Sequence, residues 1–329
     1  MKPFLARVDP ELLPGLEYSL MHPPPTTLPG LAAFRANAAA PAGTALPEGV
    51  TVRDCTVDGL ALRVFTPPGA GPHPAIYWLH GGGMIAGTVD LDTPYCAALC
   101  LRTAAVVVAV DYRLAPEHPY PAAMDDAAAG LAWLFASAAA LSVDPSRVAV
   151  AGSSAGGGLA AALTLQNRDA GGPALAFAYL MYPMLDATHT SPSAREFAAI
   201  PTWNRAHSEF AWKCYLGAAA ELSPYAVPAL AKDLSGLPPT LIQTGELDLF
   251  RDEDITYASR LLQAGVPTEL HVYPGAYHGF ELNCPESAVG RQSLRDRDRS
   301  LIRALHGQPA DPVTSPVSSI STPAEGSLL

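Results

Sequence analysis

Basic clusters and membrane-length apolar runs are both missing from this sequence, and their absence narrows what the protein can be. Lys and Arg number 20 against 31 Asp and Glu, a formal net charge of −11, and no stretch gathers the basic residues together. Such a chain is not suited to nucleic acid or to anionic membranes. The most apolar helix-like stretch, 127–143, contains glycine and serine and is flanked by aspartates. We therefore expect no membrane span and a small-molecule partner.

Cysteines are also few, and their pattern excludes two kinds of site. The five are odd in number and show no Cys-x-x-Cys spacing: Cys55, Cys96, Cys100, Cys214 and Cys284. This argues against a disulfide framework and against a zinc site, and we expect neither a metal nor a cofactor. The N-terminus has early charges and no apolar core followed by a small-residue cleavage site, so it does not resemble a signal peptide. The expected location is the cytoplasm.

What the chain does have is a regular alternation of two kinds of segment. Short apolar runs typical of strands covered on both faces occur at 75–80, 104–110, 147–152, 175–182, 239–245 and 268–274. Helix-like segments lie between most of them, at 93–102, 124–140, 155–167 and 253–264. This order predicts an α/β fold with a mostly parallel central sheet flanked by helices. Before it, two alternating runs joined by Asp58-Gly59 predict an antiparallel hairpin.

Two interruptions of this rhythm suggest how the chain is divided. Residues 1–48 are rich in proline and alanine, and 188–234 form a long insertion with several aromatic residues between two expected strands. We expect both to lie over the strand ends as a helical cap. The core of the fold then comprises 49–187 and 235–306. The Pro/Ser/Thr-rich tail, 307–329, is predicted to be disordered.

The most informative stretch is Gly-Ser-Ser-Ala-Gly, which joins a buried strand to an alanine-rich helix. A serine at such a junction, here Ser154, sits on a strained turn that exposes its hydroxyl, the arrangement called a nucleophile elbow. Gly152 and Gly156 omit the Cβ atoms that would crowd the turn. An incidental serine in a glycine-rich connection is the alternative, because the motif is short.

A second glycine-rich loop follows the strand at 75–80. Its three glycines could form a flexible linker, but a loop of this type can also bring bare backbone amides to a reacting oxyanion. The amides in question belong to Gly82, Gly83 and Ala155. His80 precedes the serine in the chain, contrary to the order serine, acid, histidine, and we interpret it as structural.

The acid and the base should follow the serine, each after a later strand. Asp248 comes three residues after the strand at 239–245, although Glu246, Asp252, Glu253 and Asp254 are close enough to compete. Asp252 to Asp254 look like helix-capping carboxylates. His278 lies between two glycines after the last strand, whereas His271 lies inside that strand and is expected to belong to the sheet.

Five motifs in this order resemble the hormone-sensitive-lipase-like branch of the α/β-hydrolases. They are HGGGM (80–84), DYRLAPEHPYPAAMDD (111–126), GSSAGG (152–157), GELDLFRDED (245–254) and YHGF (277–280). The resemblance implies an α/β-hydrolase fold, a catalytic triad of Ser154, Asp248 and His278, and an oxyanion hole of Gly82, Gly83 and Ala155. It also implies that Asp111, Arg113 and Glu117 hold the scaffold. Ser153 stands where the common subgroups carry Asp or Thr, so no subgroup is assigned.

The predicted function is therefore hydrolysis of small to medium apolar acyl esters through an acyl-enzyme. The same scaffold also supports amide or peptide cleavage, and plant hormone receptors that resemble this family have lost the base. A structural or interaction protein is a further alternative, but it leaves the serine turn and the glycine loop unexplained. The strand at 268–274 is a candidate edge strand that could pair two copies into a homodimer.

Overall fold

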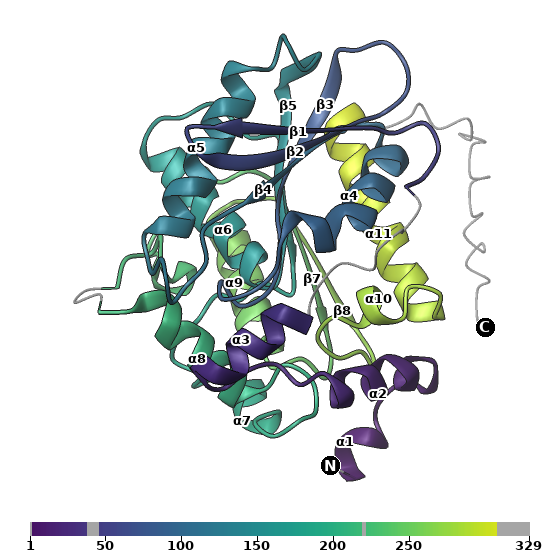
Figure 1. The fold of residues 1–329 in the computed structure, drawn as a ribbon, viewed down its shortest axis with the longest axis vertical. Coiled ribbons are helices and arrows are strands. Elements are labelled where there is room, and N and C mark those ends of the chain that lie inside the picture. Colours follow the sequence, from purple (N-terminus) through teal and green to yellow (C-terminus); the bar gives the residue numbers. More distant parts are fainter. Residues whose placement is uncertain (1, 38–45, 219–221, 308–329) are drawn as a thin grey trace, which may run out of the picture.

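A single mixed sheet forms the centre of the molecule (Figure 1). The computed structural model describes residues 2–37, 46–218 and 222–307, and within these ranges the sheet order is β1-β2-β4-β3-β5-β6-β7-β8. The strands are β1 (Thr51–Val57), β2 (Leu60–Thr66), β3 (His73–Leu79), β4 (Val106–Asp111), β5 (Val143–Ser153), β6 (Phe177–Met181), β7 (Thr240–Gly245) and β8 (Thr268–Tyr273). The pairs β1–β2 and β2–β4 are antiparallel and all other pairs are parallel. The predicted hairpin and central sheet are thus both present.

Helices cover both faces of the sheet because its strands bury side chains alternately on either side. In β3, Tyr77 and Leu79 pack into one apolar cluster, whereas Ile76 and Trp78 pack into the other. The first cluster includes side chains of α5 (Ala122–Ala136), α6 (Ala155–Asp169) and α9 (Arg251–Gln263). The second includes those of α4 (Val89–Thr103) and α11 (Ala288–His306).

The N-terminal segment and the insertion lie close together at one end of the sheet, in the lower part of Figure 1. The N-terminal segment forms α1 (Lys2–Leu5), a 3-10 turn (Pro10–Leu12), α2 (Leu13–Met21) and α3 (Leu28–Asn37). The insertion forms α7 (Pro192–Glu196), α8 (Arg205–Leu216) and a 3-10 turn (Pro228–Leu230). Both contribute to a third apolar cluster, in which Phe4 packs edge-on against Phe197. The short helix α10 (Phe280–Asn283) joins the same cluster.

One helical prediction needs correction, and two helices were not predicted. The segment expected to be helical through residue 140 ends at Ala136, because the chain turns at Ser137 and must reverse direction before β5. The helices α3 and α11 were not predicted from the sequence. In α11 the charged residues of RQSLRDRDRSLIRALH outnumber the apolar ones that reach the core, such as Leu301 and Leu305. Residues 308–329 of the predicted tail lie outside the described residues.

The charged residues of the DYRLAPEHPYPA motif hold the scaffold together, as expected. Asp111 accepts a hydrogen bond from the amide of Val89 at the start of α4. Arg113 forms an ion pair with the buried Asp126. Glu117 binds Arg35 of α3, which also donates to the carbonyls of Ile85 and Ala115. The N-terminal segment is therefore attached to the core loops. No helix in the described ranges is long and apolar enough to cross a bilayer.

Candidate active site

Ser154 occupies a strained turn between β5 and α6. Its backbone has φ 55° and ψ −117°, a region that residues with a side chain rarely adopt. The amide of Ser154 donates to the carbonyl of Met181 at 2.8 Å, which fixes the turn to the neighbouring strand. A Cβ atom on Gly156 would overlap the carbonyl of Leu79, so glycine is required for the close approach of α6 to the sheet.

His278 connects Ser154 to Asp248. Its Nε2 atom lies 2.9 Å from Ser154 Oγ, and its Nδ1 atom lies 2.8 Å from Asp248 Oδ2. Because a carboxylate can only accept, Nδ1 carries the hydrogen and Nε2 is free to take a proton from the serine hydroxyl. Asp248 is fully enclosed, and its other oxygen accepts from the amide of Phe250 at 2.9 Å. The three side chains follow different parallel strands whose carboxyl ends meet at one edge.

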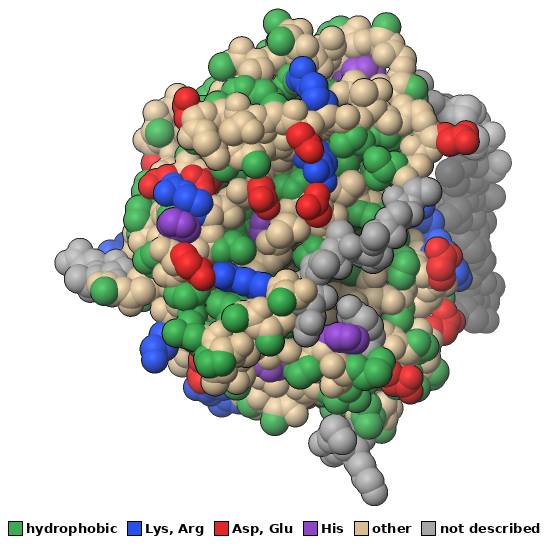
Figure 2. All heavy atoms as spheres, viewed as in Figure 1, with side chains coloured by type: hydrophobic (Ala, Val, Ile, Leu, Met, Phe, Trp, Pro, Cys, Tyr) green, Lys and Arg blue, Asp and Glu red, His purple; other side chains and the backbone are tan. Residues whose placement is uncertain are grey.

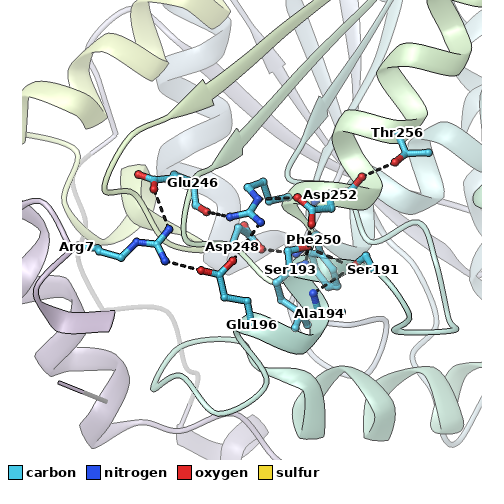
Figure 3. Close-up of polar contacts among 12 residues, drawn as sticks. Arg7, Ser191, Ser193, Ala194, Glu196, Glu246, Asp248, Phe250, Asp252 and Thr256 are labelled. Atoms are coloured by element: carbon cyan, nitrogen blue, oxygen red, sulfur yellow. Dashed lines mark hydrogen bonds and ion pairs between the residues drawn. The ribbon is translucent and has the colours of Figure 1, made fainter. Parts of the chain in front are cut away.

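Three of the four competing carboxylates, those of Glu246, Asp252 and Glu253, have other partners. Glu246 binds Arg7, and Asp252 binds Arg251 and the amide of Ser193 (Figure 3). Glu246 also accepts a hydrogen bond from the amide of Gly275. Glu253 accepts from the amides that follow β6, at Leu185 and Asp186. Asp252, Glu253 and Asp254 form the acidic first turn of α9, where carboxylates favour the helix dipole, as expected. The N-cap residue, Phe250, makes no side-chain cap, and Asp252 and Glu253 instead accept hydrogen bonds from other segments.

Figure 3 also shows how the N-terminal segment reaches the loop that carries Asp248. Arg7 forms ion pairs with Glu196 of α7 and with Glu246, and Arg251 also pairs with Glu196. The guanidinium groups of Arg7 and Arg251 both lie over the ring of Phe197. Because Arg7 and its two partners are substantially exposed, each of these pairs adds little stability, but together they connect three segments.

The glycine loop presents unpaired amides beside Ser154. Gly82 and Gly83 have φ values of +114° and +65°, and Ala155 is the first residue of α6. Within the described ranges, none of the three amides donates to a protein acceptor. A Cβ atom on Gly83 would lie 2.6 Å from the ring of Trp203. Free amides and a helix N-terminus are the groups that stabilise a developing oxyanion.

The other predicted histidines have structural positions. His80 donates from Nδ1 to the carbonyl of Gly81 at 2.7 Å, and its ring stacks on Tyr112 with centroids 4.1 Å apart. His271 lies on β8 and contacts Glu269 at 2.7 Å. No group of three His, Cys, Asp or Glu side chains in the described part of the chain could hold a metal ion.

A cavity of about 260 Å³ opens onto Ser154 and His278. Its wall combines the glycine loop with apolar side chains from the N-terminal segment, the core and the insertion. The apolar and aromatic members are Pro24, Phe34, Leu91, Tyr182, Trp203 and Leu282, and Asp92 is the carboxylate of the wall. Phe34 and Asp92 were not predicted as site residues, because nothing in their local sequence signals a distant contact.

Behind His278 lies a buried pair of side chains that the sequence does not predict. The ring of Tyr182 packs against the imidazole with centroids 4.4 Å apart, and its hydroxyl donates to Glu281 at 2.5 Å. Glu281 is almost fully buried, and burial raises its pKa from 4.5 to about 7. A single glutamate in the short helix α10 carries no sequence signal for this role.

Replacing Glu281 with glutamine is expected to change how stability depends on pH. Between about pH 4.5 and about pH 7 the unfolded wild-type chain releases this proton and the folded chain keeps it, so the contribution of Glu281 to wild-type stability falls as the pH rises. Glutamine does not titrate, so the variant does not lose this stability. The difference in free energy of unfolding, variant minus wild type, should therefore rise by about 3 kcal/mol between the lower and the upper pH. Urea denaturation at both ends of the window measures this difference, and parallel curves would contradict it.

Comparisons with known proteins agree with this architecture. A family model described as the alpha/beta hydrolase fold matches residues 76–282. The chain is 42% identical over 278 residues to carboxylesterase NlhH of Mycobacterium tuberculosis, covering 79% of this chain and 85% of that protein. It is 36% identical over 234 residues to ethyl acetate hydrolase of Pseudomonas putida, covering 68% and 73%. Among solved structures, a bacterial heroin esterase superposes with a TM-score of 0.84 at 39% identity, covering 91% of this chain and 98% of that one.

These findings confirm the predicted fold class and the predicted enzyme class, a carboxylesterase-type hydrolase. The likeness extends over most of the chain, including the glycine loop, the serine turn and the loop of His278. The chain belongs to the α/β-hydrolase family, in its hormone-sensitive-lipase-like branch.

Proposed function

We propose that the protein hydrolyses carboxylic esters with Ser154 as nucleophile, His278 as general base and acid, and Asp248 as the group that orients the imidazole. The observation that carries this proposal is the unbroken contact chain from Ser154 Oγ through His278 to the buried Asp248 carboxylate. Nucleophilic catalysis explains why a serine on a strained turn is hydrogen-bonded to a histidine that is itself held by a buried carboxylate.

The reaction proceeds in two steps. His278 Nε2 removes the hydroxyl proton as Ser154 Oγ attacks the ester carbonyl carbon, and the amides of Gly82, Gly83 and Ala155 hold the oxyanion. The imidazolium then gives its proton to the departing alcohol, leaving an acyl-serine. Water attacks the acyl carbon by the same route, with His278 as base, and releases the acid.

The N-terminal segment and the insertion 188–234 form the cap in this proposal, over a core of 49–187 and 235–306. Support comes from the cavity wall, which takes Pro24 and Phe34 from the first and Trp203 from the second. The volume of about 260 Å³ lies just below the usual range of ligand pockets, which favours small to medium acyl groups. Amide or peptide cleavage and a non-enzymatic receptor remain the alternatives, and an intact base disfavours the receptor.

The partner in this proposal is a small ester. Figure 2 shows acidic and basic side chains interspersed on one face, and the formal charge of −11 disfavours nucleic acid. All five cysteines are free, which suits the proposed cytoplasmic location. β8 lies at the sheet edge, so pairing of two copies there stays a prediction.

The direct test of the function is hydrolysis of p-nitrophenyl esters of increasing acyl length by the purified protein. We expect turnover of short and medium esters that declines for long ones, because the cavity is small. Absence of turnover with every ester, in protein shown to be folded by circular dichroism, would favour the receptor.

Replacing Trp203 with alanine is expected to move the preferred acyl length upward. Its ring lies against Gly83 and narrows the cavity, and its indole nitrogen has no hydrogen-bond partner to lose. The ratio of kcat/KM for long over short esters should rise by about tenfold, because the enlarged cavity could bury one or two more methylene groups of the acyl chain. Trp133, which is half-buried in α5 and absent from the cavity wall, provides a matched control as Trp133→Ala. An unchanged ratio in Trp203→Ala would show that this ring does not limit the substrate.

A further inference from the structure

One carboxylate stands in the wall of an otherwise mainly apolar cavity. Asp92 lies in the first turn of α4 and lines the same cavity as Ser154 and His278. It is half-buried, and within the described ranges no Lys or Arg lines this cavity. Burial raises the pKa of the Asp92 carboxyl, so ionising it without a partner costs free energy.

The contacts of Asp92 account for only part of this charge. Burial raises the pKa of the carboxyl, and the nearby His80 lowers it, but by less. One oxygen, Oδ2, accepts a hydrogen bond from the indole nitrogen of Trp78 at 2.6 Å. A neutral acceptor such as an amide oxygen could also accept from this donor, although more weakly. The other oxygen has no hydrogen-bond partner among the described residues and is not completely enclosed. Asp92 therefore offers an acceptor to whatever occupies the cavity.

Asp90, two residues earlier in the same helix, differs from Asp92 in both its partner and its location. It occupies the same first turn of α4, where carboxylates favour the helix dipole, and it forms an ion pair with Arg63 at 2.6 Å. Asp90 does not line the cavity of Ser154. Position in the helix alone would therefore account for both acids, but only Asp92 belongs to the wall of the candidate active site.

The rest of the cavity wall suits one kind of partner for this group. Phe34, Tyr182 and Trp203 contribute aromatic rings, and the remaining lining is mostly apolar. Aromatic faces together with a carboxylate attract ammonium groups, most strongly when water is excluded. A neutral apolar ester gains nothing from the carboxylate and leaves it unpaired.

We propose that Asp92 is a specificity-determining residue that binds an ammonium group of the substrate, so that the preferred substrates are esters carrying a tertiary or quaternary amine. This inference rests on the proposed esterase function and names the substrate class of the same site. The ester carbonyl lies at Ser154 and the ammonium group lies against Asp92 and the aromatic rings.

The test compares esters that differ only in charge. For the alcohol side, the pair is butyrylcholine and neohexyl butyrate, in which carbon replaces the quaternary nitrogen. For the acyl side, the pair is the methyl ester of γ-butyrobetaine and the corresponding methyl ester in which a carbon atom replaces the quaternary nitrogen. Rates are followed by pH-stat for wild type, Asp92→Asn and the control Asp90→Asn, with each fold checked by circular dichroism.

Wild type is expected to have the higher kcat/KM for the ammonium ester of at least one pair. In Asp92→Asn, which keeps an oxygen acceptor for Trp78, the ratio of ammonium to neutral ester should fall about tenfold, mainly through KM. Asp90→Asn should keep the wild-type ratio. Equal losses for both esters in Asp92→Asn, or a wild-type preference for the neutral ester in both pairs, would overturn the inference.

Two further measurements distinguish failure of this inference from misfolding of the variant and from failure of the proposed esterase function. If Asp92→Asn does not fold, inhibition of neohexyl butyrate hydrolysis by tetramethylammonium chloride, compared with sodium chloride at equal ionic strength, decides for wild type. Specific inhibition supports the inference, and equal effects of the two salts overturn it. Turnover of p-nitrophenyl esters without any ammonium preference would refute this inference alone. No turnover of any ester would refute the proposed function, and the inference with it.

Discussion

Ser154→Ala is expected to lower kcat for p-nitrophenyl butyrate by about four to six orders of magnitude, the range that removal of a triad nucleophile costs in serine hydrolases. The substitution removes the Oγ atom that lies 2.9 Å from His278 Nε2 and that would form the acyl-enzyme. The free amides of Gly82, Gly83 and Ala155 remain, so a residual rate above that of water is expected.

The neighbouring serine makes a sharp control. Ser153 is also buried and lines the same cavity, but its hydroxyl contacts neither His278 nor Asp248. Ser153→Ala should keep kcat within about tenfold of wild type, since it removes no group that reacts. Thermal unfolding of both variants should stay near wild type. Comparable losses in the two variants, or a retained rate in Ser154→Ala, would remove Ser154 from the mechanism.

The serine turn and its partners could be predicted because they depend on local chemistry and on chain order. Apolar runs of strand length and helix-like segments alternate, and this alternation predicts that Ser154, Asp248 and His278 each follow a parallel strand. The carboxyl ends of such strands lie at one edge, so order in the chain becomes proximity in space. The structure brings these three side chains into one hydrogen-bonded chain.

What could not be predicted depends on contacts between distant segments. The carboxylate of Glu253 was expected to interact with the first turn of its own helix. It instead accepts hydrogen bonds from the amides of Leu185 and Asp186, which lie 68 and 67 residues away in the chain. In the sequence, Asp92 looks like any acidic residue in the first turn of a helix. Only the folded structure shows that it binds Trp78 and lines the cavity. A carboxylate in a helix has the same local pattern whether it faces water, a backbone amide or a substrate, so its role becomes visible only in three dimensions.

Asp248→Asn is expected to lower kcat by about four orders of magnitude while leaving the fold intact, as observed for serine proteases when the triad acid becomes an amide. The carboxylate holds the hydrogen of the imidazole on Nδ1 and stabilises the imidazolium that forms as Ser154 attacks. An asparagine NH₂ group directed at Nδ1 would instead favour the tautomer with the hydrogen on Nε2. His278 could then no longer accept the serine proton.

Glu246→Gln tests whether this loss is specific to Asp248. Glu246 lies two residues earlier in the same loop, but its carboxylate binds Arg7 and the amide of Gly275 rather than His278. Because these contacts are partly exposed, the glutamine variant should lose less than about 1 kcal/mol of stability and keep kcat within about tenfold. If instead Glu246→Gln abolished activity and Asp248→Asn did not, the base would be oriented by a different carboxylate, and the contact at 2.8 Å would be structural. Since Asp248 is enclosed and its second oxygen already accepts from Phe250, the hydrogen bond to His278 is the main interaction that a change to asparagine would reverse.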